Sequence, residues 1–366
     1  MSTYKNTAEP RARQQRTASI AGAQANPVTW WASIGVLITL FQFYVWGSWI
    51  NSGPARVVPL NPSEMEPLRA AIFHSLEFIS PLLCSVCLWY FLLKPLIREK
   101  RLAQSGLVIL MMPFLYFWDP SAMYFTTWEA YSSYFTSWGN WMGYYPGEIA
   151  TNVGSIPEPV FLMLPGYTWQ VGVPVLIMLW GMRKCKERYP NASTPQMIAA
   201  GIVFGCIYDF VYEVPFLRTQ IWSYWGSVGE WSLWGGHWYQ FPLYEIAFWG
   251  LTTGLFASVL YFTNDKGQTF VERGLERLRY GTAAKGVIRF FALLGIFNLI
   301  YLVGFTMPMN LFTIHSGPPP ADTPAHLVNG VCGPDTHYAC PSADLPINRA
   351  GANIFVGPGL TLRSKQ

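Results

Sequence analysis

Charged residues are scarce in this 366-residue chain. Asp, Glu, Lys and Arg make up only 12% of it, about half the share in an average soluble domain, which excludes both an ordinary soluble protein and a disordered one. Six cysteines are too few for a disulfide-dense secreted domain. A net charge of +4 is too small to indicate a nucleic-acid-binding protein, so we expect no nucleic-acid partner.

Motifs for bound cofactors are lacking as well. The sequence has no Walker loop for nucleotide phosphates, no haem-attachment motif and no His and Cys spacing typical of a zinc site. We therefore expect neither a cofactor nor a metal ion in this protein.

Long apolar runs dominate the chain instead, and 51% of its residues are hydrophobic. A helix needs about 20 apolar residues to cross a membrane, and the sequence offers seven runs of roughly this kind. We therefore predict an all-α fold, a polytopic membrane helix bundle with seven transmembrane helices. The predicted spans are Val28–Ile50, Leu68–Leu93, Ser105–Trp118, Val160–Met182, Pro195–Leu217, Tyr239–Thr263 and Val287–Asn310.

Basic residues alternate between the two sides of these spans. Of the 24 Lys and Arg residues, 18 lie in the N-terminal tail or in the connections near Lys94–Arg101, Arg183–Arg188 and Lys266–Arg289. Such residues are retained in the cytoplasm. We therefore expect a multi-pass protein of the cell membrane with its N-terminus inside and its C-terminus outside.

This topology divides the chain into three parts. We expect residues 1–27 to form a polar, basic cytoplasmic tail, residues 28–310 the seven-span membrane domain, and residues 311–366 a flexible extracytoplasmic tail. Two aromatic-rich outer loops, 119–159 and 218–238, belong to the membrane domain. Cys332 and Cys340 lie in the outer tail, on the oxidising side, where a disulfide can join them; two free thiols are the alternative.

Six ionisable residues lie in the predicted spans or at their ends, where a buried charge costs several kcal/mol. They are His74, Glu77, Asp119, Asp209, Glu213 and Glu245. No Lys or Arg lies deep in a predicted span to pair with them. A rise of about 1.5 Å per residue places all six in the outer half of the membrane, so we expect them to meet in one layer.

The spacing of these residues indicates acid–base chemistry. His74 and Glu77 are three residues apart, and Asp209 and Glu213 are four apart, so each pair shares a helix face. A carboxylic acid in a low-dielectric environment keeps its proton, as a general acid requires, and a second carboxylate nearby can act as the base. The alternative is that these polar groups only fasten helices together.

Small residues extend the same face of the fifth predicted span. Gly201 and Gly205 precede Asp209 at steps of four residues, a pattern that lets another helix approach closely. Gly250 and Gly254 on the sixth predicted span have the same spacing. We therefore expect these two helices to pack against each other.

Aromatic residues gather beside the predicted acidic layer. Residues 117–145 and 221–241 contain 20 of the 61 aromatic residues of the chain. Aromatic faces stabilise cations, so a cover of Trp and Tyr over an acidic layer suits a reaction through an oxocarbenium ion or a carbocation. An interfacial belt of the kind common in membrane proteins is the alternative, and the two interpretations are compatible.

Several short motifs follow one another in a fixed order between residues 70 and 270. They are Phe117-Trp118-Asp119-Pro120 with Tyr124 and Tyr131, Gly139-Asn140-Trp141 leading to Pro146-Gly147, Asp209 with Glu213, and Gln240-Phe241-Pro242-Leu243-Tyr244-Glu245. This pattern resembles the AveC-like spirocyclases of polyketide biosynthesis. The resemblance implies a membrane-bound enzyme that closes a dihydroxy-ketone to a spiroketal, in some members with an additional dehydration.

Ketal chemistry suggests the roles of the candidate residues. One hydroxyl adds to the ketone, an acid expels water from the hemiketal, and the second hydroxyl attacks the oxocarbenium ion. We expect Asp209 or Glu213 to be the acid and Glu245 or Asp119 to be the base. His74 and Glu77 would support them. The expected substrate is a hydrophobic small molecule from the lipid bilayer, and the predicted substrate-binding residues are Trp118, Tyr124, Trp128, Tyr131, Trp141, Trp234 and Gln240.

Other functions fit parts of this pattern. A membrane terpene cyclase would use the same acidic layer to protonate an epoxide or an alkene. A transporter would place ionisable groups along a whole path through the bilayer, whereas the inner halves of the spans offer only groups such as Thr252 and Thr253. A lipid-binding or scaffold protein would give no reason for six acid–base groups at one depth.

Overall fold

The computed structural model describes most of the chain. It covers residues 26–53, 65–100, 102–147, 154 and 156–328, the cysteines at 332 and 340, and the backbone of 355–356 and 362–363. All but the last two residues of the predicted N-terminal tail (1–27) lie outside the described residues, as does most of the predicted C-terminal tail beyond residue 328.

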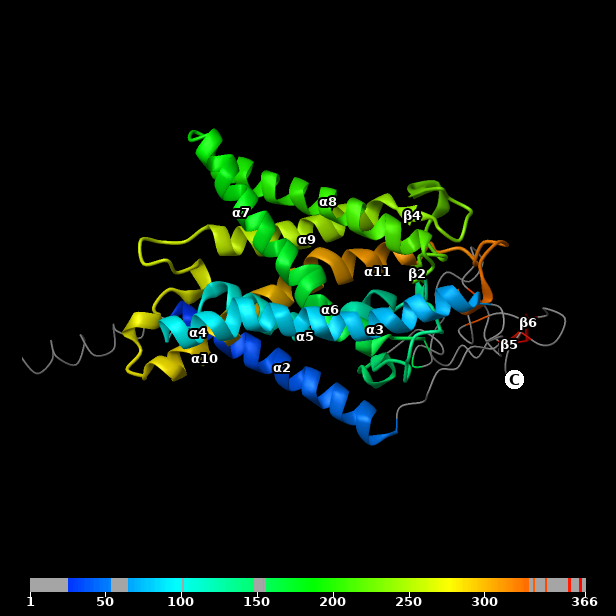
Figure 1. Cartoon of the computed structure of the whole chain (residues 1–366), viewed down its shortest axis with the longest axis horizontal. Coiled ribbons are helices and arrows are strands. Elements are labelled where there is room, and N and C mark those ends of the chain that lie inside the picture. Colours follow the sequence, from blue (N-terminus) through cyan, green and yellow to red (C-terminus); the bar gives the residue numbers. More distant parts are fainter. Residues whose placement is uncertain are drawn as a thin grey trace, which may run out of the picture.

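Helices dominate the described residues, and seven of them are long and apolar enough to cross a membrane (Figure 1). The predicted all-α bundle of seven membrane helices is therefore confirmed. The third helix continues to Met123 rather than ending at Trp118, which brings Asp119 inside the span. The seven spans are Pro27–Asn51, Pro67–Glu99, Gln104–Met123, Val160–Arg188, Thr194–Arg218, Leu243–Tyr261 and Thr282–Thr313.

Three spans contain a π-helical segment, whose turn is wider than that of an α-helix. In the second span, α3 (Pro67–Cys87) continues through η1 (Leu88–Leu93) into α4 (Lys94–Glu99). In the fourth span, α6 (Val160–Tyr167) continues through η5 (Thr168–Gly172) into α7 (Val173–Arg188). In the seventh span, α10 (Thr282–Tyr301) continues through η9 (Leu302–Thr306) into α11 (Met307–Thr313). The remaining spans are α2 (Pro27–Asn51), α5 (Gln104–Tyr116) with the 3₁₀ turn η2 (Asp119–Met123), α8 (Thr194–Arg218) and α9 (Leu243–Tyr261).

Local sequence signals explain where several helices begin. Pro27 and Pro67 occupy the first positions of α2 and α3, where a backbone N–H would have no partner within the helix. Ser193 and Gln196 form a capping box in front of α8, and the Ser193 N–H donates to Gln196 Oε1 at 2.7 Å.

The helices form a buried centre and an apolar periphery. In the most apolar stretch of the third span, which includes α5, 78% of the residues are buried, and in that of α9 the share is 67%. The span of α3 and that of α8 bury only 11% and 22%, and they expose side chains such as Phe78, Leu82 and Val211. Continuous exposed apolar surface of this kind is unfavourable in water and suits contact with lipid.

Glycines bring α8 and α9 together backbone to backbone. A Cβ atom on Gly205 would lie 2.5 Å from the carbonyl oxygen of Gly250, and one on Gly201 would lie 3.1 Å from that of Gly254. No side chain fits between the helices at these positions. The predicted packing of the two small-residue faces is therefore confirmed.

The two aromatic-rich loops gather at one end of the bundle, and we call this region, residues 119–147 and 219–242, the aromatic cap (Figure 1). Strand β1 (Ala130–Tyr131) pairs antiparallel with β2 (Trp222–Ser223), which ties the two loops to each other. Strands β3 (Ser232–Leu233) and β4 (Phe241–Pro242) close a second antiparallel pair, and β5 (Phe355–Val356) pairs with β6 (Leu362–Arg363). The short 3₁₀ turns are η3 (Met142–Tyr144), η6 (Gly229–Trp231), η7 (Phe270–Glu272), η8 (Leu275–Arg277) and η10 (Ala325–Leu327).

The segment after α11 is attached to the aromatic cap. The Ser133 N–H donates to the carbonyl oxygen of His326 at 2.9 Å, and the Trp238 N–H donates to the Asp322 carboxylate at 3.1 Å. Cys332 and Cys340 form a disulfide, which decides between the two alternatives that the sequence left open.

We predict that the aromatic cap faces the outside and that the turn between α7 and α8 faces the cytoplasm, because basic residues gather at the α7 end. In a chain whose free cysteines are replaced by serine, a membrane-impermeant thiol reagent applied to intact cells should label Glu230→Cys. It should label Asn191→Cys only after permeabilisation. Labelling of both positions in intact cells would contradict the predicted orientation.

Candidate active site

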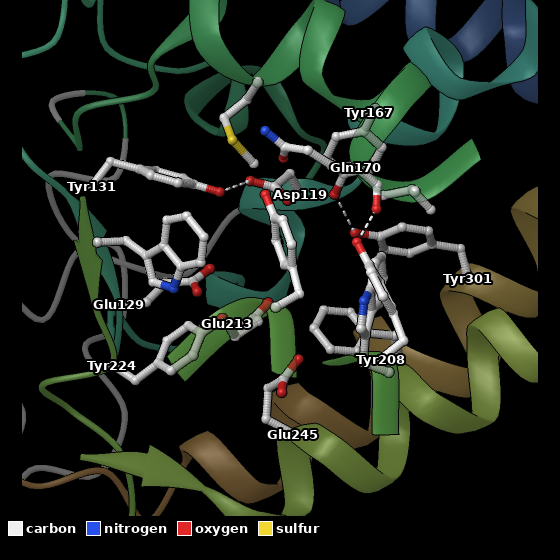
Figure 2. Close-up of a pocket in the computed structure, with 16 residues that line it drawn as sticks. Asp119, Glu129, Tyr131, Tyr167, Gln170, Tyr208, Glu213, Tyr224, Glu245 and Tyr301 are labelled. Atoms are coloured by element: carbon white, nitrogen blue, oxygen red, sulfur yellow. Dashed lines mark hydrogen bonds between the residues drawn. The ribbon is translucent and has the colours of Figure 1, made fainter. Parts of the chain in front are cut away.

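A cavity lies among the helices, and residues of the aromatic cap such as Glu129 and Tyr224 form part of its wall (Figure 2). Its volume is about 60 Å³, which is room for a few waters. Carboxyl and tyrosine side chains dominate its wall, and no Lys or Arg is among the described residues that line it. The lining residues are Asp119, Glu129, Tyr131, Met163, Tyr167, Gln170, Val171, Tyr208, Tyr212, Glu213, Trp222, Tyr224, Glu245, Trp249, Tyr301 and Phe305.

One wall of the cavity is built around Asp119, the first residue of η2. The Tyr131 hydroxyl donates to Asp119 Oδ2 at 2.7 Å, and the Tyr167 hydroxyl donates to Oδ1. The Tyr301 hydroxyl lies 2.9 Å from that of Tyr167, and it is the donor because Tyr167 gives its own proton to Asp119. These bonds fix the carboxyl group and stabilise negative charge on it.

Two of the π-helical segments place this network. Tyr167 is the last residue of α6 before η5, and Tyr301 is the last residue of α10 before η9. Gln170 of η5 and Phe305 of η9 line the cavity as well. The wider turn moves side chains off the regular helical face, which is why π segments are frequent at functional sites.

Three further carboxyl groups lie at or beside another part of the wall, and we call them the acid cluster: Asp209 and Glu213 on α8, and Glu245 on α9. One carboxylate oxygen from each lies within 4.8 Å of the other two. Asp209 is fully buried, Glu245 is 2% exposed, and the Tyr224 hydroxyl donates to Glu213. The glycine contact between α8 and α9 brings the three groups together, as the sequence predicted for them.

Two further carboxyl groups come from the cap side. Glu129 lines the cavity, and the fully buried Glu158 accepts the Tyr116 hydroxyl at 2.6 Å. Burial raises the pKa of Glu129 well above its usual value, and nearby carboxylates, Asp119 first among them, raise it further. Burial raises the pKa of Glu158 in the same way. Burial and the neighbouring carboxylates therefore favour the protonated form of Glu129, which opens onto the cavity.

The structure brings part of the predicted site together. Asp119, Glu213, Glu245 and Tyr131 line one cavity, and Asp209 lies beside it in the acid cluster. The expected common layer thus holds four of the six ionisable residues singled out in the sequence.

The other two, His74 and Glu77, do not reach the cavity. The His74 side chain is 54% exposed on α3, and its Nδ1 lies 3.0 Å from Glu77 Oε2. Glu77 also accepts the Thr136 N–H at 2.6 Å. This pair connects α3 to the aromatic cap. The prediction that it lies in the cavity was wrong, because depth along a helix does not determine which way a side chain points around the helix axis.

Two predicted substrate-binding residues, Trp118 and Tyr124, line a separate cavity. Its wall is almost entirely apolar, and its volume is about 340 Å³. Met307 and Leu311 of α11 also line it and are more than half exposed, so it opens at the periphery of the bundle. Asp119 faces the first cavity, so the step from Trp118 to Asp119 separates the two.

The remaining predicted substrate-binding residues hold the cap together. Trp128 Nε1 donates to the Ala122 carbonyl at 3.1 Å, and Trp141 Nε1 donates to the Phe117 carbonyl at 2.9 Å. Gln240 Nε2 donates to the backbone carbonyl of Trp225 at 2.7 Å. Trp234 is 39% exposed, and the Arg218 guanidinium lies over its ring. None of these four is among the residues that line the carboxyl-rich cavity.

The sequence alone pointed to Tyr131 but not to Glu129, Tyr167 or Tyr301. Glu129 lies in the loop that follows the third span, away from the spans and their ends, where an ionisable residue stands out. One feature of the sequence could have indicated Glu129: it and Asp119 are the only acidic residues in the aromatic-rich segment 117–145. Tyr167 and Tyr301 carry no signal, because tyrosines are ordinary residues near the ends of membrane helices.

The fold and the site define a polytopic membrane protein with a carboxyl- and tyrosine-lined cavity among its helices. The family model described as spirocyclase AveC-like matches residues 99–328, and the chain belongs to this family of AveC-like spirocyclases. The match contains every residue that lines the cavity and confirms the resemblance seen in the motifs. Neither a curated protein nor a solved structure matches the chain. Membership implies a polyketide spirocyclase with membrane helices.

Proposed function

We propose that this protein is a cyclase of the cell membrane that closes a dihydroxy-ketone polyketide to a spiroketal by acid–base catalysis. One observation carries the proposal. Two acidic side chains open onto the same aromatic-walled cavity: Glu129, whose protonated form is favoured by burial, and Asp119, whose carboxylate is held by tyrosine hydroxyls. Family membership supports this reaction over others that use an acid and a base.

The two carboxyl groups supply a complete proton cycle. One substrate hydroxyl adds to the ketone and gives a hemiketal. Glu129 donates its proton to the hemiketal hydroxyl, which leaves as water, and the second substrate hydroxyl attacks the oxocarbenium carbon while Asp119 accepts its proton. Return of that proton from Asp119 to Glu129 restores the site, so the net reaction is ketone-diol to spiroketal plus one water. Asp119 keeps the expected role of base, and Glu129 replaces Asp209 or Glu213 as the acid.

Aromatic rings around the cavity support the cationic intermediate. Trp222, Trp249 and Tyr212 line it. A ring face against a cation contributes ~0.5–2 kcal/mol. A difference of ~1.4 kcal/mol between the two faces of the oxocarbenium ion already gives about tenfold stereoselectivity. Because ketals also form spontaneously in acid, the protein contributes mainly by orienting the two hydroxyls.

A polyketide is larger than the carboxyl-rich cavity, since small-molecule sites usually measure about 300–1,000 Å³. Its reacting carbon and oxygens belong in this cavity, and its hydrophobic arms must lie outside. The separate apolar cavity lined by Trp118 opens beside Met307 and Leu311 at the periphery of the bundle, where a hydrophobic substrate can first bind from the lipid bilayer.

The proposal is tested by product analysis. Deletion of the gene should accumulate a ketone-diol, and the purified protein in lipid nanodiscs should convert that compound to one spiroketal stereoisomer with loss of the mass of one water. Nanodiscs without protein, at the same pH, should give slower conversion and a mixture of isomers. Accumulation of an uncyclised isoprenoid would identify a terpene cyclase instead, and unchanged metabolites with no conversion in vitro would refute a cyclase function.

A further inference from the structure

We propose that the acid cluster of Asp209, Glu213 and Glu245 binds a divalent metal ion of the Mg²⁺, Mn²⁺ or Ca²⁺ class. The inference concerns the same cavity as the proposed cyclase but does not depend on the identity of the substrate. It also departs from the expectation that the sequence supports, since the sequence contains no known metal-binding motif.

The geometry of the three carboxyl groups fits one ion. One oxygen from each group lies within 4.8 Å of the other two. Oxygen ligands lie about 2.0–2.6 Å from these metals, so oxygens bound to one ion are at most about 5 Å apart. Asp209 and Glu213 come from successive turns of α8, and Glu245 comes from the first turn of α9. Facing helices of a bundle commonly build metal sites in this way.

The surroundings of Asp209 and Glu245 independently favour a bound cation. Both oxygens of the fully buried Asp209, and Oε2 of Glu245, are buried and receive no hydrogen bond from the described residues. The cavity has no described Lys or Arg in its wall. A buried carboxylate without a donor or a cation is strongly unfavourable. A divalent ion satisfies all three groups at once.

The second shell and the cavity also fit such a site. The Tyr224 hydroxyl donates to Glu213 Oε2, which orients that carboxylate and leaves its other oxygen for the metal. Ligands that are all oxygen favour hard cations over zinc or copper. Three protein ligands leave further coordination positions, and Glu213 and Glu245 face a cavity with room for a few waters. A substrate oxygen that replaces one of these waters would be polarised by the ion.

Metal binding is tested directly on the full chain in lipid nanodiscs. Titration with Mn²⁺, followed by electron paramagnetic resonance, should give one bound ion per chain. The isosteric variants Asp209→Asn and Glu245→Gln should each weaken binding at least about tenfold, because each removes a charged ligand. Glu129→Gln is the matched control, since it removes a carboxyl group of the same cavity outside the acid cluster, and it should bind within about twofold of the wild type.

A second probe covers the case in which the ligand variants do not insert. Tb³⁺ bound in the acid cluster should luminesce when nearby tryptophans are excited, and Trp222→Phe and Trp249→Phe, which keep all three carboxylates, should reduce this emission. Absence of bound Mn²⁺ in the wild type, equal binding in the ligand variants, or emission that the tryptophan changes leave intact would each overturn the proposal. If no metal binds and the spiroketal still forms normally, the metal proposal fails, the proposed function stands, and Asp209 and Glu245 share a proton instead. If metal binds but no cyclisation occurs, only the proposed function is refuted.

Discussion

Replacement of Asp119 by Asn should lower the turnover of a ketone-diol by about 10²–10⁴-fold, the contribution typical of one general acid or base. Asn has nearly the same shape as Asp, but it cannot accept the proton of the attacking hydroxyl. It also disturbs the donors Tyr131 and Tyr167, which both point their hydroxyl protons at this group. The measurement is kcat in lipid nanodiscs, with insertion checked by size-exclusion chromatography.

Glu77→Gln provides the control for this prediction. Glu77 is a carboxyl group at a similar predicted depth, yet it binds Thr136 of the aromatic cap and does not line the cavity. Its variant should keep turnover within about twofold of the wild type. Wild-type turnover in Asp119→Asn together with a large loss in Glu77→Gln would move the active site to the α3 side of the cap.

Replacement of Gly250 by Leu should destabilise the protein by about 1–3 kcal/mol or more and abolish turnover. A Cβ atom at this position would lie 2.7 Å from the backbone nitrogen of Cys206, so α8 and α9 would have to separate. Their separation pulls Glu245 away from Asp209 and opens the wall of the cavity. The measurement is the melting temperature in nanodiscs, together with turnover of the folded fraction.

Gly47→Leu in α2 is the matched control. A Cβ atom at Gly47 meets nothing within 4 Å, and Leu favours helix over Gly by roughly 1 kcal/mol. This variant should therefore melt at or above the temperature of the wild type. Equal melting temperatures for Gly250→Leu and the wild type would show that the close contact of α8 and α9 is not needed for stability.

The sequence predicted the architecture because membrane crossing depends on the length and composition of a segment, both of which can be read directly. The glycine faces of α8 and α9 were predictable for a similar reason, since a spacing of four residues fixes a helix face. Asp209 and Glu213 share that face, so their approach to Glu245 followed. Depth alone was a weaker guide, and it grouped His74 with residues from which it points away.

The rest of the site depends on tertiary structure that leaves no pattern in the chain. Glu129 reaches the cavity because β1 pairs with β2 and draws one loop against the other. Tyr167 and Tyr301 meet because η5 and η9 interrupt two helices at the same level. A π segment has no composition of its own, so a reading based on regular helical periodicity places the residues beyond it on the wrong face.

The lack of any described Lys or Arg in the cavity wall also makes the site an electrostatic filter. Without a bound metal ion, the ionised carboxyl groups beside the cavity create a negative potential that buried, low-dielectric walls screen poorly. A phosphate or carboxylate group would then be repelled from such a space, whereas a neutral polyol or ketone would not.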